Sequence, residues 1–131
     1  MVCWEGKKYK LRCSDNYDEY LKDLGTGLMV RKVLSNSYPT IELKRDDEIY
    51  TLTTTTTIKT INSSFKLGET MDEVALDGRR VQSTYSMEGD TLSVEQRGDY
   101  FSTVVYTFSD YQLDCVLSSP NVKCTQIYDV V

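Results

Sequence analysis

The chain has 131 residues, no histidine and a formal net charge of −5. This length predicts one domain, residues 1–131, with a core of its own, and the negative charge argues against nucleic-acid binding. Without histidine, a histidine base and most catalytic zinc sites are excluded, so we expect neither a catalytic site of that kind nor a metal site.

A short first strand, "KYKLRC", is followed by the one stretch with helical spacing. Its apolar positions are Tyr17, Tyr20, Leu21 and Leu24. Asn16 and Glu19 fit a capping box, Gly25 fits a C-terminal stop, and Thr26 is placed to cap a second short helix. We therefore expect a helix-turn-helix over about residues 15–36. It carries too few basic residues for a DNA reader, so we expect it to pack as a cap on a sheet.

From residue 38 onward, the sequence reads as strands separated by turn signals at intervals of roughly 8 to 12 residues. Such regular spacing is typical of a β-sandwich or β-barrel, and with the opening segment it predicts about ten strands. The turn signals fall at residues 46–47, 68–69, 77–78, 88–90, 97–99, 109–110 and 119–121.

Two of these strands carry polar side chains on both faces. In "YTLTTTTTIKT", interpreted as one strand, threonines fill one face, and the other face carries Leu52, Thr54, Thr56 and Ile58. The last strand places Cys124, Gln126 and Tyr128 in a row on one face. A strand over a dry core has one clean apolar face. These patterns therefore predict a sheet closed around a wet cavity, in which hydroxyls and amides meet water or a ligand.

Three stretches resemble a known family: "GKKYKLRCSDNYDEYLKDLGTGLMVRKV", "FKLGETMDE" and "CTQIYD". They are similar to the intracellular fatty-acid-binding and cellular retinoid-binding proteins from Gly6 to Asp129, with an opening closer to the invertebrate branches. The resemblance implies an all-β fold: a ten-stranded, up-and-down antiparallel β-barrel of the calycin type, with the helical lid over a water-containing cavity. It also implies a monomeric carrier of a hydrophobic small molecule (a long-chain fatty acid, retinoid or related lipid) that is no enzyme and needs no cofactor.

The family's carboxylate clamp consists of two inward arginines and a tyrosine. By the resemblance, Tyr106 and Gln126 stand at the two arginine positions, and Tyr128 keeps the tyrosine position. An ionised carboxylate without a cationic partner is costly to bury, so these residues favour a neutral head group such as an alcohol, aldehyde, amide or ester. The resemblance also assigns cavity-lining positions to Thr54, Thr56, Gln96, Val104, Cys115 and Leu117.

The cavity entrance is expected beside the lid. The resemblance places there Leu28, Met29, Arg31, Lys59 and Arg79. Lys59 or Arg79 can supply a charge for an acid bound in the reversed orientation; the alternative is that both are ordinary charges at the barrel rim. Arg31 and Lys32 predict a weak, transient attraction to anionic membrane surfaces. The competing function is a β-barrel that binds no lipid and serves as a protein-interaction module.

The first residues of the chain lack the apolar core of a secretory signal, which predicts a cytoplasmic protein with reduced thiols. The four cysteines show no dense framework of paired spacings. If the last turn centres on Ser119 and Pro120, Cys115 and Cys124 lie opposite each other on neighbouring strands, within disulfide reach. We therefore expect these two thiols to be close but reduced.

Overall fold

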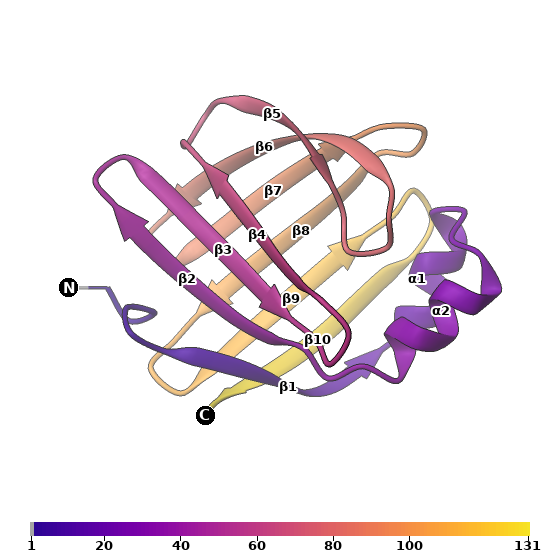
Figure 1. Cartoon of the computed structure of the whole chain (residues 1–131), viewed down its shortest axis with the longest axis horizontal. Helices are drawn as coiled ribbons and strands as arrows, with labels where there is room; N and C mark the ends of the chain where they lie inside the picture. Colours follow the sequence, from indigo (N-terminus) through magenta and orange to yellow (C-terminus); the bar gives the residue numbers. More distant parts are fainter. Residues whose placement is uncertain (1) are drawn as a thin grey trace.

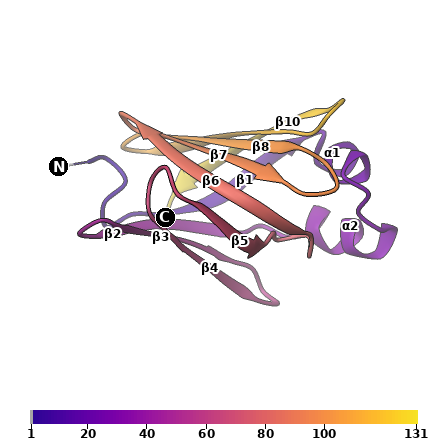
Figure 2. The same ribbon diagram turned by 90° about the horizontal axis from the view of Figure 1, so that it is seen from above.

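The computed structural model describes residues 2–131, which contain ten strands and two helices. The strands form one antiparallel sheet that rolls into a barrel, with both helices at one end (Figure 1, Figure 2). With one exception, each strand pairs with its sequence neighbours, and β1 also pairs with β10, which confirms the predicted up-and-down barrel. The elements are β1 (Lys8–Asp15), α1 (Tyr17–Asp23), α2 (Leu28–Ser35), β2 (Thr40–Asp46), β3 (Ile49–Thr55), β4 (Thr60–Phe65), β5 (Thr70–Val74), β6 (Arg80–Glu88), β7 (Thr91–Arg97), β8 (Ser102–Phe108), β9 (Gln112–Ser118) and β10 (Lys123–Val130).

One pair of sequence neighbours breaks this rule. In the part of the chain that the structure describes, β4 and β5 stand at the two ends of the sheet and share no backbone pairing. We call this gap the seam. Side chains cross it: the Ser63 hydroxyl donates to Glu73 Oε1 at 2.8 Å, and the Phe65 ring stacks on the Tyr85 ring with centroids 3.7 Å apart. Contacts between side chains therefore complete the barrel where hydrogen bonds between strands do not.

All seven predicted turns fall at connections between strands, and the threonine tract holds a further turn that was not predicted. The tract is not one strand, because β3 ends at Thr55 and β4 begins at Thr60. The Thr56 hydroxyl accepts the backbone N–H groups of Ile58 and Lys59, at 3.3 and 3.1 Å. A threonine side chain that bonds its own backbone two or three residues on builds a turn without glycine or proline, which explains why no breaker marked this position.

The helical lid, α1 and α2 together, forms where the spacing predicted it, and Tyr20, Leu21 and Leu24 are buried. Gly25 follows α1 with a φ of +80°, as expected of a C-terminal stop. Among residues 2–131, no helix is both long and apolar enough to cross a membrane.

Neither predicted side-chain cap forms, although Asn16 does stand at the N-cap position of α1. Asn16 has a left-handed φ of 67° and makes no side-chain cap bond; its amide instead donates to the Lys123 carbonyl at 3.4 Å. The N-cap of α2 is Gly27, while the Thr26 hydroxyl donates to Asp77 Oδ2 at 3.1 Å. In each case the side chain bonds to the barrel rim instead of its own helix, because the rim offers an acceptor that local sequence cannot reveal.

The buried residues form two clusters. The larger one gathers aromatic side chains in the barrel, where Trp4 contacts Tyr50 and Phe108 with ring centroids 6.2 and 6.5 Å apart. The smaller one lies under the lid and joins Tyr20, Leu21, Leu24, Leu34 and Cys124. Residues from both clusters also face the cavity described below.

The prediction that Cys115 and Cys124 lie directly opposite each other is wrong; they are diagonal neighbours on adjacent strands. Cys115 pairs with Gln126 and Cys124 with Leu117 across β9 and β10, so the two cysteines are out of register. Ser118 pairs with Lys123, which centres the turn one residue later than predicted. Moving the centre of a hairpin by one residue moves cross-strand partners by two. Both cysteines are free and buried.

Candidate functional site: the barrel cavity

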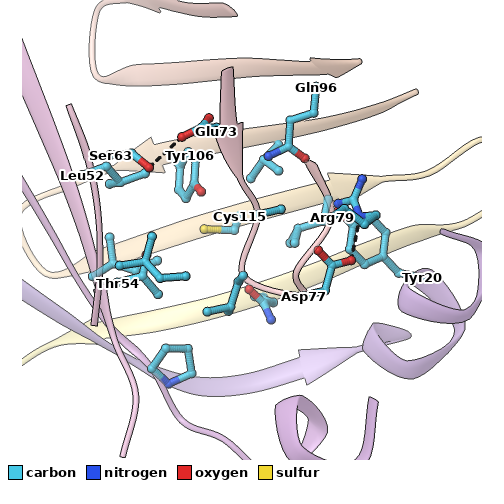
Figure 3. A pocket seen from close by; sticks show the side chains of 18 of the residues that line it. Tyr20, Leu52, Thr54, Ser63, Glu73, Asp77, Arg79, Gln96, Tyr106 and Cys115 are labelled. Atoms are coloured by element: carbon cyan, nitrogen blue, oxygen red, sulfur yellow. Dashed lines mark hydrogen bonds and ion pairs between the residues drawn. The ribbon is translucent and has the colours of Figure 1, made fainter. Parts of the chain in front are cut away.

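The barrel encloses a cavity of about 130 Å³, taken as the space open to the centres of water molecules. A water molecule needs roughly 10–15 Å³ by this measure, so the cavity has room for on the order of ten waters. Residues of β2 through β10 and of α1 line it, and Figure 3 shows the side chains of most of them. The lining mixes aliphatic side chains with hydroxyls, amides and three charged groups, which suits a ligand with an apolar chain and a polar end.

The last strand contributes a linked pair of polar side chains. Gln126 and Tyr128 line the cavity and are 5% and 3% exposed. The Tyr128 hydroxyl donates to Gln126 Oε1 at 3.0 Å, and Gln126 Nε2 donates to the Ser14 hydroxyl at 3.1 Å. Cys124, the third residue of the predicted row, is fully buried but packs in the cluster under the lid. The row faces inward, and its two hydrogen-bonding members reach the cavity.

Tyr106 of β8 and Cys115 of β9 are paired across their strands and both line the cavity. Burial raises the pKa of the Tyr106 and Tyr128 phenols well above the ordinary value. Burial likewise raises the pKa of the Cys115 thiol. The two phenols therefore keep their protons at neutral pH, so that each can donate and accept a hydrogen bond, and the thiol is not a reactive thiolate.

Arg79 lines the cavity close to the lid, where it forms an ion pair. Its Nε lies 2.6 Å from Asp77 Oδ2, and the Asp77 side chain is only 3% exposed. Figure 3 shows the pair beside Tyr20. The same carboxylate oxygen accepts the Thr26 hydroxyl, which ties the pair to the connection between the two lid helices. Tyr20 lies beside them; burial raises its pKa to about 12 although the Arg79 charge acts in the opposite direction. Arg79 is therefore a cavity residue whose charge already has a counter-ion.

The other predicted positions divide into two groups. Thr54, Gln96, Val104 and Leu117 line the cavity. Thr56 does not, because it lies in the β3–β4 turn described above. Of the predicted entrance residues, Leu28 and Met29 are exposed on α2 rather than in the cavity wall. Lys59 Nζ donates to the Leu76 carbonyl at 3.1 Å. Arg31 is held by Asp18 at 3.0 Å and by the Thr26 carbonyl at 2.7 Å, so it presents no free charge.

A carboxylate also faces the cavity. Glu73 of β5 accepts the Ser63 hydroxyl at Oε1, 2.8 Å, and the Tyr85 hydroxyl at Oε2, 2.6 Å. Burial, followed by the bond to Glu73, raises the Tyr85 pKa, so Tyr85 acts as the donor in this bond. Figure 3 shows Glu73 beside Ser63 and Tyr106. The charged residues of the cavity are therefore Glu73, Asp77 and Arg79.

A known family combines this barrel, lid and cavity: the model of the lipocalin / cytosolic fatty-acid binding protein family matches residues 5–129. The chain belongs to this family. It is 39% identical over 125 residues to the muscle fatty acid-binding protein of Schistocerca gregaria. The aligned part covers 94% of this chain and 93% of that protein.

Solved structures of the family agree with this assignment. A fatty acid-binding protein from brain tissue of Drosophila melanogaster has a TM-score of 0.92 and 48% identity, covering 96% of this chain and 98% of its own. The Schistosoma mansoni fatty acid binding protein, solved in complex with arachidonic acid, has a TM-score of 0.95 and 26% identity and covers 100% of this chain and 98% of its own. The predicted resemblance to invertebrate members is confirmed.

In this member of the fatty-acid-binding family, Glu73 is a cavity residue that was not predicted from the sequence. A signal was present: in "ETMDEV" the strand alternation puts Met71 and Glu73 on one face and Asp72 on the other. Both Met71 and Glu73 are partly buried, whereas Asp72 is exposed. The stretch contains several acidic residues, so it resembled a solvent-exposed strand rather than one with a carboxylate directed inward.

Proposed function

We propose that this protein binds a hydrophobic small molecule in the barrel cavity and carries it through the cytoplasm as a monomer, without turnover. The observation that supports this most directly is the cavity inside the barrel, whose wall joins aliphatic side chains to the hydrogen-bonded pair Gln126 and Tyr128. Burial of an alkyl chain there contributes roughly 0.8 kcal/mol per CH₂. Family membership supports the same function.

We further propose that the preferred head group is not a carboxylate. Tyr106, Gln126 and Tyr128 offer hydroxyl and amide groups that donate and accept but carry no charge. The guanidinium of Arg79 lies in the wall but already pairs with Asp77. A carboxylate that enters this cavity loses its hydration and finds no free cation among the lining residues, which disfavours it relative to an alcohol of the same length.

The test is displacement of an environment-sensitive hydrophobic fluorophore. We expect the fluorophore to bind with a stoichiometry of about one, and we expect long-chain alcohols to displace it at lower concentration than the matching acids. Titrations near neutral pH with purified, delipidated protein measure both. A fluorophore that does not bind, or that no lipid displaces, would contradict lipid carriage and favour the protein-interaction module.

Release of the ligand at a membrane is proposed to use α2. Four apolar side chains of this helix are exposed: Leu28, Met29, Val30 and Val33. An exposed apolar helix face is suited to insertion at a bilayer surface. Because Arg31 is tied to Asp18 and Thr26, Lys32 is the basic residue of α2 available for anionic lipids.

We expect Met29→Glu to slow fluorophore transfer from the protein to vesicles by about tenfold, because burying a methionine side chain contributes roughly 1.5–3 kcal/mol. Transfer is followed by stopped-flow quenching with phosphatidylcholine vesicles that contain phosphatidylserine. Tyr111→Glu is the matched control, since Tyr111 is 83% exposed and lies in the β8–β9 turn at the other end of the barrel. Equal slowing by both variants would contradict a role for α2.

A further inference from the structure

The cavity carries a net negative charge, and Glu73 is its source. Among the residues that line it, two are acidic and one is basic. Asp77 and Arg79 neutralise each other at 2.6 Å. Among residues 2–131, none of the ion pairs includes Glu73. The interior therefore contains one carboxylate that has hydrogen-bond donors but no cation.

The Glu73 carboxylate is fixed in place with part of its bonding capacity unused. Ser63 holds one oxygen from β4 and Tyr85 holds the other from β6. A carboxylate offers about four lone-pair sites, and these two bonds occupy two of them. The carboxylate thus keeps acceptor sites for a further donor, and it lies in the wall of the cavity that a ligand would enter (Figure 3).

A ligand with a cationic head compensates this charge. A carboxylate withdrawn from water without a counter-charge is costly, and pairing it with a cation that also donates hydrogen bonds offsets that cost. A protonated amine supplies both the charge and up to three donors. An alcohol supplies one neutral donor, and a carboxylate supplies none and adds repulsion.

We propose that Glu73 is a specificity-determining residue and that the cavity selects long-chain amines or amino alcohols, with the ammonium group held by the Glu73 carboxylate. This inference rests on the proposed lipid-binding function and adds the chemical class of the head group. Tyr106, whose buried phenol lies within electrostatic reach of Glu73, supplies a neutral hydroxyl beside it. The order of affinity at equal chain length is then amine, alcohol, carboxylate.

The experiment compares tetradecylamine, tetradecanol and tetradecanoate as competitors of the fluorophore near neutral pH. In the wild-type protein we expect the amine to bind about tenfold more tightly than the alcohol, as a charge-assisted bond exceeds a neutral one. Glu73→Gln should remove this preference and leave the alcohol within about threefold. Asp72→Asn is the matched control: it removes the same charge from the neighbouring, exposed position of β5.

The outcomes separate the two proposals. If none of the three competitors displaces the fluorophore, lipid carriage itself fails. If all three displace it but the amine has no advantage, or Asp72→Asn acts like Glu73→Gln, the role of Glu73 is wrong while lipid carriage stands. Because Glu73→Gln alters a side chain at the seam, a second measurement uses the wild-type protein: the ¹³C shift of the Glu73 carboxyl should move on titration with the amine and stay unchanged with tetradecanoate. A carboxyl shift that responds equally to both would also overturn the inference.

Discussion

Replacing Gln126 by arginine should tighten binding of oleate by about tenfold or more and weaken binding of oleyl alcohol. In the wild-type protein the Gln126 amide is neutral and bridges Tyr128 and Ser14. A guanidinium at this buried position can donate charge-assisted hydrogen bonds to a ligand carboxylate. Such a bond is roughly twice as strong as a neutral hydrogen bond. The alcohol cannot neutralise the new buried charge, so it loses affinity.

Displacement of the fluorophore by oleate and by oleyl alcohol near neutral pH gives the relative affinities of the acid and the alcohol. We compare these affinities between the wild-type protein and the variant. Gln82→Arg is the control, because Gln82 is exposed on β6 and gains the same charge outside the cavity. If the wild-type protein already prefers oleate and Gln126→Arg leaves that preference unchanged, the head-group assignment is wrong. Lys59 and Arg79 would then be the residues to test as counter-charges.

Phe65→Ala should lower the free energy of unfolding by about 3–5 kcal/mol, the usual cost of truncating a buried phenylalanine. Phe65 is 3% exposed and lies between two other rings, with centroids 5.7 Å from Tyr50 and 3.7 Å from Tyr85. Its effect is expected near the upper end of that range. The stack crosses the seam, where β4 and β5 have no backbone hydrogen bonds to hold the barrel closed.

Urea denaturation followed by far-ultraviolet circular dichroism measures this loss. Phe101→Ala is the control: Phe101 is 49% exposed in the β7–β8 connection, and a surface truncation of this kind changes stability by about 0.5 kcal/mol. Similar destabilisation by both variants would show that the aromatic stack does not hold the seam.

The sequence predicted the features that depend on neighbouring residues. Glycine, aspartate and proline marked seven turns because turn geometry is decided by the φ values and side-chain bonds of a few consecutive residues. The row of Gln126 and Tyr128 followed from the two-residue period of a strand. The helical stretch followed from the spacing of its apolar positions. Its two predicted side-chain caps do not form.

Tertiary structure alone decided the features that depend on distant partners. The side chains of Asn16 and Thr26 cap no helix because they bond to acceptors at Lys123 and Asp77, which lie within reach only after the lid docks on the barrel.

The cavity charge depends on the same kind of long-range contact. Local sequence cannot show that Glu73 bonds Ser63 across the seam, because barrel closure sets the distance between these two side chains. The ion pair of Asp77 with Arg79, by contrast, joins residues only two positions apart in the chain. The sequence by itself therefore determined a barrel with a polar interior row, whereas closure of the sheet decided that this interior holds a carboxylate with hydrogen-bond donors but no cation.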